Sequence, residues 1–201
     1  MKCDIILAGV GGQGVLSISA IIASSAMKVG LQAKQSEVHG MAQRGGAVLA
    51  HLRLSDEPIA SDIIPRGGAD MIVSMEPLES LRHLAYLSPQ GSLLTATDPL
   101  VNITDYPPLD GILDKIRSIP KARLVNADEL ARKAGSGRAT NMVMVGAASH
   151  LLPISPEAIE SYIKEAFARK GESVVETNLK AFRSGRETAA TAAGKPAPHR
   201  S

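Results

Sequence analysis

The sequence predicts an α/β protein in which helices cover both faces of a mostly parallel β-sheet. First, an apolar run at residues 5–10 leads into a turn with four glycines and then into an apolar segment of helical length. Second, further short apolar strands follow, with helical segments between them. Third, 201 residues with 44% hydrophobic content suffice for one such domain and do not require two. Together these observations predict a three-layer α/β/α Rossmann-like domain with C-terminal helices.

The first helix is expected at residues 13–28, directly after the glycine turn. Its apolar residues lie on nearly every side, which indicates a helix buried on more than one side. Gly30 stands where a left-handed C-cap would end this helix. A strand at residues 31–38 and another at residues 47–54, which alternates with period two, are expected next. An antiparallel pairing of these two strands would make the sheet mixed.

The later elements follow from apolar runs and helix-capping residues. Pro77 suits the first turn of a helix, Ser155 is a good N-cap with Pro156 behind it, and Gly171 ends the helix that follows. Small residues in the helix that begins at Thr140 or Asn141 allow close approach of another helix or subunit. The expected strands are residues 69–75, 92–97 and 122–126, and the expected helices are residues 76–85, 111–118, 128–133, 141–148, 155–171 and 173–184.

The composition limits the classes of function. A net charge of +2 and an aromatic content of 2% give little support to nucleic-acid binding. Cys3 is the only cysteine, so an internal disulfide or a thiolate cluster is excluded, and a cytoplasmic location is expected. Cys3 itself is expected to be a small buried apolar residue. No signal peptide and no membrane span are expected. The domain is expected to occupy residues 1–187, with residues 188–201 as a flexible tail.

Three glycines of the first turn, Gly9, Gly11 and Gly14, fit the G-x-G-x-x-G spacing of dinucleotide-binding turns. That function also requires an acidic residue about 20 positions later, and the nearest acid is Glu37, at the end of the second strand. A phosphate-binding P-loop is disfavoured because Val15 and the residue after it replace the required Lys-Ser/Thr pair. The turn therefore has no assigned ligand, and its glycines equally suit close packing of helix on strand.

The loop between the second and third strands is the other informative segment. Long loops rich in glycine within a compact domain are often functional. Arg44, followed by Gly45 and Gly46, suits an anion site in which a guanidinium lies beside free backbone N–H groups. The alternative is a surface hairpin with a solvated arginine. His39 is either an acid/base group or a surface residue that forms hydrogen bonds.

Glu76 follows a buried strand, and so belongs to the edge at which open α/β sheets place ligands. It equally suits the role of an acid at a helix N-terminus. We find no H-E-x-x-H or G-x-S-x-G motif, no plausible Cys–His pair and no metal-ligand spacing among the five histidines. The functional candidates that remain are glycine loops, an arginine and carboxylates. These residues suit the binding of an anionic ligand or a partner, and we expect no catalytic residue on this chain.

These segments together resemble the gamma-type domain of 2-oxoacid:ferredoxin oxidoreductases. The resemblance rests on the glycine turn at residues 6–14, the loop at residues 37–46, the strand at residues 69–72 with the Glu-Pro pair behind it, and the Thr-Asn-Met segment at residues 140–142. It extends from about residue 3 to residue 186. The similarity is nearest to the small subunits of those members that act on indolepyruvate and other arylpyruvates.

The resemblance implies a heteromeric enzyme that oxidatively decarboxylates a 2-oxoacid to its acyl-coenzyme A and reduces ferredoxin. It places thiamine diphosphate and iron–sulfur clusters on a large partner subunit, so this chain should carry no cofactor and be inactive alone. The candidate ligand or partner residues are Gly9, Gly11, Gly12, Gln13, Gly14, Glu37, His39, Gly40, Arg44, Gly45, Gly46, Glu76 and Asn141.

Two other functions remain compatible with the residues. The chain could be a free-standing Rossmann-like nucleotide-binding reductase or sensor, although the ribose-binding acid is missing from its expected place. It could also be an interaction scaffold whose glycine turn binds nothing. The exact 2-oxoacid, the stoichiometry and any contact with coenzyme A do not follow from the sequence.

Overall fold

The computed structural model describes residues 1–39 and 45–192, and its centre is a six-stranded sheet in the order β2-β3-β1-β4-β5-β6. The strands are β1 (Lys2–Val10), β2 (Gln32–His39), β3 (Ala47–Ser55), β4 (Ala69–Ser74), β5 (Leu87–Ala96) and β6 (Ala122–Val125). Strands β1, β4, β5 and β6 are parallel neighbours, whereas β3 runs antiparallel to both β1 and β2. The predicted mostly parallel but mixed sheet is therefore confirmed.

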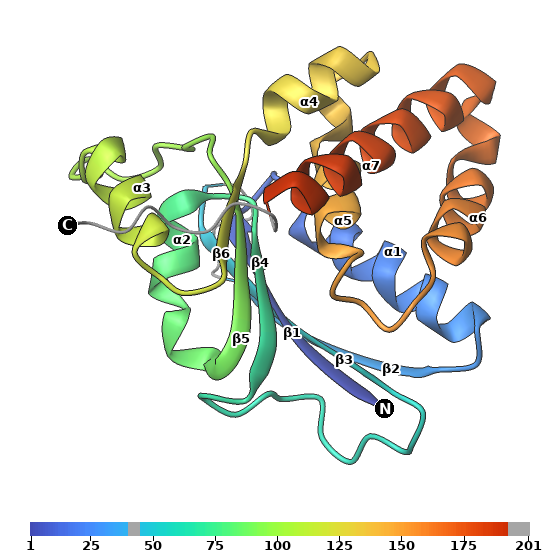
Figure 1. Cartoon of the computed structure of the whole chain (residues 1–201), viewed down its shortest axis with the longest axis horizontal. Helices are drawn as coiled ribbons and strands as arrows, with labels where there is room; N and C mark the ends of the chain where they lie inside the picture. The colour runs from blue at the N-terminus through green and yellow to red at the C-terminus, as the bar shows by residue number, and fades with distance from the viewer. Residues whose placement is uncertain (40–44, 193–201) are drawn as a thin grey trace.

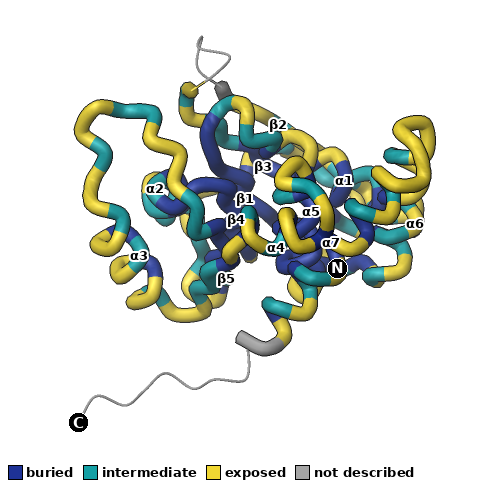
Figure 2. The backbone as a smooth tube through the Cα atoms, turned by 90° about the horizontal axis from the view of Figure 1, so that it is seen from above, coloured by how far each residue is buried: buried dark blue, intermediate teal, exposed yellow. Residues whose placement is uncertain are grey.

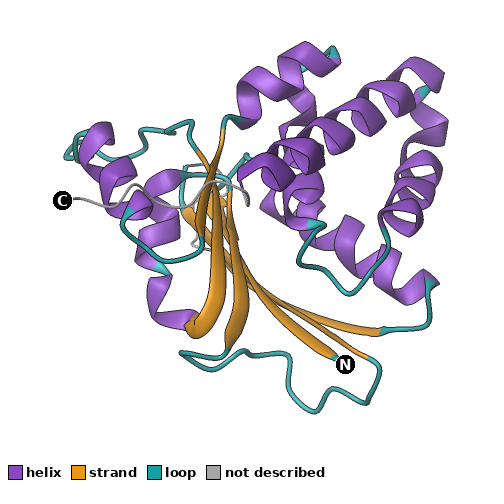
Figure 3. Cartoon of the chain, in the orientation of Figure 1, coloured by secondary structure: helices purple, strands orange, loops and turns teal. Residues whose placement is uncertain are grey.

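Helices cover both faces of the sheet, as Figure 1 and Figure 3 show. One face carries α2 (Pro77–Arg82) and α3 (Leu109–Arg117). The other carries α1 (Val15–Lys28), α4 (Ala127–Ala134), α5 (Thr140–Ala148), α6 (Pro156–Phe167) and α7 (Glu172–Ala192). Because successive strand residues face opposite sides, Ile5 and Leu7 of β1 belong to the core under α1, while Ile6 belongs to the core under α2 and α3. The three-layer prediction is confirmed.

Helix α1 is buried on more than one side, as its all-round apolar pattern predicts. It packs against β2 and β3 and also against α5 and α6. Ile18, Ile22 and Ala26 are almost fully buried, while Leu16 and Met27 are exposed. Gly30 has φ +86°, the left-handed conformation expected just after the end of this helix.

Two elements before the middle of the chain differ from expectation. Strand β5 begins at Leu87 and not at residue 92, because Pro89 and Gly91, which are unusual within strands, lie in its first half. The pairing of β5 with β4 shifts register between Ala69 and Met71. Helix α2 ends at Arg82, and a short 3-10 helix at Leu84–Tyr86 replaces its expected last turn.

The last helix continues to Ala192, beyond the end expected at residue 184. Gly185 lies inside the longer helix and serves close packing, because a Cβ atom on it would lie 2.0 Å from the carbonyl oxygen of Val143 in α5. The glycine therefore belongs to a helix–helix contact inside α7. The proposed domain boundary at residue 187 remains a prediction.

Seen from above, the buried central strands β1 and β4 lie between helices whose outer sides are exposed (Figure 2). Within the described part of the chain, no helix combines the length and the apolar character that crossing a membrane requires.

Candidate functional site

The carboxyl ends of the parallel strands lie along one edge of the sheet, and the turn after β1 belongs to this edge. Gly12 and Gly14 have φ values of +102° and +76°, a region that favours glycine. Gly14 is the N-cap residue of α1, and no side chain caps this helix. The first N–H groups of α1 are therefore directed toward this edge.

Packing explains two glycines of this turn. A Cβ atom at Gly9 would lie 2.8 Å from Cγ2 of Val15, and one at Gly14 would lie 2.2 Å from Nδ2 of Asn141. A Cβ atom at Gly12 would meet nothing within 4 Å, although its positive φ disfavours other residues. For Gly9 and Gly14 the structure supports the close-packing interpretation, whereas Gly12 leaves open backbone at the surface.

Two amide side chains hold the turn in place. Gln13 Oε1 accepts a hydrogen bond from the Val10 N–H at 2.8 Å, and Gln13 Nε2 donates to the carbonyl oxygen of Met75 at 3.1 Å. Asn141 Nδ2, at the start of α5, donates to the carbonyl oxygen of Gly14 at 3.3 Å. The turn is therefore tied to the end of β4 and to α5, and the structure brings Asn141 to the glycines as one site.

The turn is also hydrogen-bonded to the glycines that follow the second loop. The Gly11 N–H donates to the carbonyl oxygen of Gly46 at 2.8 Å, and the Gly45 N–H donates to the carbonyl oxygen of Gly11 at 3.2 Å. Asn102 Nδ2 donates to the carbonyl oxygen of Gly45 at 2.8 Å. Both glycine segments of the sequence thus meet at one edge.

The rest of the predicted loop site is only partly described. Gly40 and Arg44 lie outside the described residues, and His39 is described only as the last residue of β2. Glu37, also in β2, is exposed, and Gln35 Nε2 donates to its Oε2 at 3.5 Å. The anion-site prediction for Arg44 and the acid/base role of His39 therefore stay predictions.

Glu76 is a buried helix cap. Its side chain is 1% exposed, and its Oε2 accepts the Glu79 N–H of α2 at 2.9 Å. Its Oε1 accepts a hydrogen bond from the Tyr106 hydroxyl. Burial and then this carboxylate raise the pKa of Tyr106 well above its usual value. Of the two interpretations of Glu76, the structure supports the acid at a helix N-terminus.

A cleft of about 440 Å³ opens beside the glycine turn, and we call it the edge cleft. Its walls come from the β1 turn, from the segments after β4 and β5, and from the starts of α4 and α5. The lining residues are Gly12, Gln13, Gly14, Met75, Ala96, Asp98, Pro99, Leu100, Ala127, Asp128, Gly137, Arg138, Thr140 and Asn141. Among the predicted residues, Gly12, Gln13, Gly14 and Asn141 thus line one cleft.

The edge cleft contains charges of both signs. Asp98 Oδ2 accepts the Asp128 N–H at 3.2 Å, and Arg132 pairs with the Asp128 carboxylate at 2.8 Å. Arg138 is the positively charged residue among those that line the edge cleft. This mixture of charges suits polar contacts with a ligand or another chain. Among the described residues that line the edge cleft, no nucleophile is hydrogen-bonded to a general base.

Sequence reasoning missed Asp98, Asp128 and Arg138. Asp98 had a usable signal, because it comes two residues after the end of β5, much as Glu76 follows β4. Arg138 had none, since it lies in a short turn between two helices and its place in the cleft depends on the fold.

Cys3 is not a reactive thiol. It is 5% exposed in β1, and burial together with the charges of Asp70 and Asp4 raises its pKa to about 12. It is a small buried apolar residue, as expected. In residues 1–39 and 45–192, no group of three or more His, Cys, Asp or Glu side chains is arranged to hold a metal ion.

Comparison with known proteins gives a consistent result over nearly the whole chain. The family model "Pyruvate ferredoxin/flavodoxin oxidoreductase" matches residues 4–188. Indolepyruvate oxidoreductase subunit IorB of Archaeoglobus fulgidus is 40% identical over 194 residues, which cover 92% of this chain and 94% of that protein. The 2-oxoglutarate synthase subunit KorC of Methanothermobacter marburgensis is 31% identical over 191 residues, with 93% and 96% covered.

A solved structure agrees with the fold. The gamma subunit of a keto/oxoacid ferredoxin oxidoreductase from Geobacter sulfurreducens superimposes with a TM-score of 0.73 at 29% sequence identity. The match covers 96% of this chain and 98% of that one.

Proposed function

This chain belongs to the pyruvate ferredoxin/flavodoxin oxidoreductase family, and on that premise we propose that it is the small subunit of an indolepyruvate ferredoxin oxidoreductase. Its relatives are subunits of 2-oxoacid oxidoreductases, so it is part of a heteromeric oxidoreductase. The observation that carries the narrower proposal is the 40% identity to an IorB subunit along nearly the full length of both chains. The single cysteine favours a cytoplasmic location.

In the proposed reaction an arylpyruvate and coenzyme A become an acyl-coenzyme A and carbon dioxide. The bond between the carbonyl carbon and the carboxylate breaks, and the thiol sulfur forms a thioester with that carbonyl carbon. The two electrons released reduce two one-electron ferredoxin acceptors, and the thiol proton leaves. Thiamine diphosphate and iron–sulfur clusters supply the bond cleavage and the electron transfer in such chemistry. We assign the clusters to a large partner subunit, because the single, buried Cys3 cannot ligate a cluster. The family resemblance assigns thiamine diphosphate to the same partner.

We assign the contact with that partner to the carboxyl edge of the sheet. Exposed apolar side chains lie at this edge, because Leu16 follows the glycine turn, Val38 is the next-to-last residue of β2 and Val101 lies in the segment after β5. Open backbone at Gly12 and the hydrogen-bonded glycines of the hairpin lie at the same edge. Exposed apolar side chains at a polar stretch of backbone suit a surface that a protein partner covers.

The first test isolates the chain, with an affinity tag, from its own host without dissociating its partners. We expect native mass spectrometry to detect a large second subunit, and the visible spectrum of the complex to show the broad absorption of iron–sulfur clusters. The complex should reduce ferredoxin with indolepyruvate and coenzyme A faster than with pyruvate or 2-oxoglutarate. A colourless homo-oligomer that carries a nucleotide would contradict the proposal. A brown complex that prefers another 2-oxoacid would contradict only its substrate.

The second test concerns Arg44, which precedes Gly45 in the sequence. If its guanidinium contacts the phosphates of coenzyme A, Arg44→Ala should raise the KM for coenzyme A about tenfold, because a charge-assisted hydrogen bond is lost. The matched control is Arg117→Ala, whose exposed guanidinium pairs with Asp114 on α3, far from the edge, and should leave the KM unchanged. An unaltered KM together with unaltered assembly in Arg44→Ala would remove this role.

A further inference from the structure

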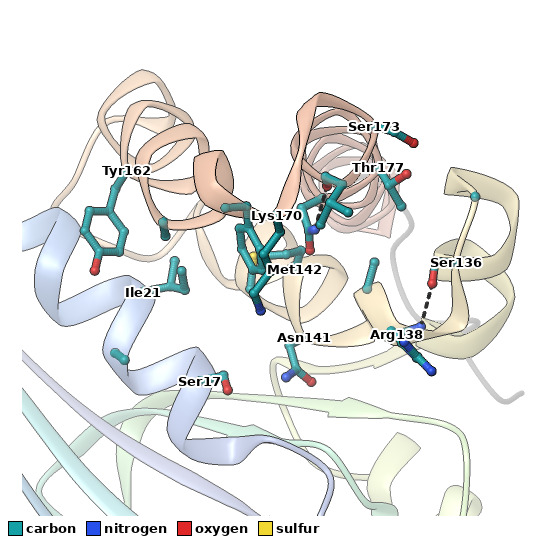
Figure 4. A pocket seen from close by; sticks show the side chains of 17 residues that line it. Ser17, Ile21, Ser136, Arg138, Asn141, Met142, Tyr162, Lys170, Ser173 and Thr177 are labelled. Atoms are coloured by element: carbon teal, nitrogen blue, oxygen red, sulfur yellow. Dashed lines mark hydrogen bonds between the residues drawn. The ribbon is translucent and has the colours of Figure 1, made fainter.

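A second and larger cavity lies on the other side of the start of α5, among the helices of the C-terminal half. Its volume is about 720 Å³, within the range of small-molecule sites. Figure 4 shows Ser17 and Ile21 of α1 on one wall and Tyr162, Lys170 and Thr177 of the α6–α7 region on the other. We call it the helical pocket.

The charges around the helical pocket have one sign. Its lining contains Lys170 and Arg138 and no Asp or Glu residue. Within the described part of the chain, neither cation forms an ion pair with a carboxylate, in contrast to Arg132 and Lys133 of the neighbouring helix α4. An anion in this pocket would therefore meet two cations without an ion pair, of which Arg138 also lines the edge cleft with Asp98 and Asp128.

Other polar groups point the same way. Lys170 stands just before α7, and Ser173, in the first turn of that helix, also lines the pocket. Asn141 and Met142 contribute the first turn of α5 from the opposite wall. The positive ends of two helix dipoles thus add to the two cations, and this combination favours a negatively charged group.

The apolar part of the lining suits a flat ring. Tyr162 and Phe167 are two of only five aromatic residues in the chain, and both line this pocket. The Lys170 ammonium lies 5.2 Å from the centre of the Phe167 ring, so cation and ring are adjacent. Ile21 and Met142 complete the apolar surface. An inorganic ion would leave this surface unused.

We propose that the helical pocket binds a planar organic anion, with its ring among Tyr162, Phe167 and Met142 and its anionic group at Lys170. Aryl carboxylates and nucleoside monophosphates share this chemistry. Arg138 and Asn141 line both the helical pocket and the edge cleft, but Lys170, Tyr162 and Phe167, which carry the proposal, do not line the edge cleft.

The test uses the complex as it is isolated from the host, with indole-3-acetate and adenosine 5′-monophosphate as probes in isothermal titration calorimetry. We expect at least one probe to bind, and the preferred probe distinguishes the carboxylate from the phosphate. Lys170→Gln should weaken that binding about tenfold, as expected for the loss of a charged hydrogen-bond donor. Tyr162→Leu should also weaken it, since it removes the ring and leaves the charge.

Lys180→Gln is the matched control, because Lys180 lies on α7, pairs with Glu176 and does not line the pocket. It should bind the probe like the unmodified complex, and all variants should melt at similar temperatures. The proposal is overturned if neither probe binds, if Lys170→Gln binds as tightly as Lys180→Gln, or if inorganic phosphate and neutral indole bind as well as the two probes. A probe held at the partner's active site would be recognised by its insensitivity to Lys170→Gln.

Discussion

Asp4 shows at the residue scale how this sheet tolerates a buried charge. Its carboxylate is fully buried in β1, and Arg53, directly opposite on β3, approaches both oxygens at 2.8 and 3.0 Å. Lys2 lies 2.7 Å from the same carboxylate. Arg53 also donates to the carbonyl oxygens of Ser61 and Ile63, so one guanidinium neutralises the acid and anchors the loop before β4.

Removal of this guanidinium should be costly. Arg53→Gln leaves the buried carboxylate with Lys2 alone, and we expect the free energy of unfolding to fall by about 3 kcal/mol. Urea unfolding of the purified chain measures the change. The double variant Asp4→Asn/Arg53→Gln should lose less than the single one, because no charge stays buried. A loss as small as that of Arg117→Gln, an exposed pair worth about 0.5 kcal/mol or less, would contradict this account.

His51 predicts a pH dependence of stability. Its Nδ1 accepts the Ile64 N–H at 3.1 Å, which requires a neutral ring, and burial lowers its pKa below the usual 6.5, with Asp62 opposing and Arg53 assisting. A lowered folded-state pKa means that the unfolded chain binds the proton more readily. The stabilising contribution is therefore complete above the unfolded-state pKa and is lost as the pH falls toward the folded-state pKa.

His51→Asn keeps an acceptor for Ile64 but does not titrate. Between about pH 7 and about pH 5, its free energy of unfolding should fall less than that of the unmodified chain. Some loss should remain in the variant, because burial also lowers the pKa of His83, which stays in place. Equal losses in both proteins would show that His51 does not contribute.

At the scale of elements, the contact between α5 and α7 depends on two glycines. A Cβ atom at Gly146 would lie 1.9 Å from the carbonyl oxygen of Phe182, and one at Gly185 would lie 2.0 Å from that of Val143. The backbones touch directly, so neither helix can move to admit a methyl group without a loss of packing along the interface.

Gly146→Ala should therefore lower the free energy of unfolding by about 2–3 kcal/mol, despite the better helix propensity of alanine. Gly111→Ala in α3 is the control, because a Cβ atom there meets nothing within 4 Å and the change should stabilise by about 0.5–1 kcal/mol. Thermal or urea unfolding compares them. Similar effects at both positions would contradict the close-contact explanation.

The same helices show what the sequence can predict at this scale. The strand, glycine turn and helix at the N-terminus follow from local pattern, because apolar periodicity and glycine conformation are local properties. Ser155, which accepts the Ala158 N–H at 3.2 Å, starts α6 as its type predicts. The end of α7 was expected at residue 184, eight residues too early, and only the position of α5 explains the glycine at residue 185 inside this helix. Local chemistry fixes an element's type more surely than its ends.

At the scale of the whole molecule, the sequence predicts those parts of the site that are built from continuous glycine-rich segments. Both glycine segments were predicted to face a ligand or partner, and the hydrogen bonds of Gly11 with Gly45 and Gly46 place them at one edge. Asp98 and Arg138 reach the same edge from segments far apart in sequence. Their convergence depends on strand order and on the path of the connecting loops, which no local pattern encodes. The sequence resemblance was sufficient to identify the family, whereas the residues that line the edge cleft could be identified only from the three-dimensional fold.

The distribution of exposed apolar side chains gives the last prediction. Val101 is 68% exposed at the carboxyl edge, where we place the partner, and Met27 is 62% exposed at the far end of α1. Val101→Lys should weaken association with the large subunit by about tenfold or more, because a charge would be buried in the contact. Met27→Lys adds the same charge at a similarly exposed position and should leave association unchanged. Competitive copurification with the unmodified chain measures both. If Met27→Lys alone disrupted the complex, the partner would lie at the far end of α1, and the carboxyl edge would be free to bind a ligand.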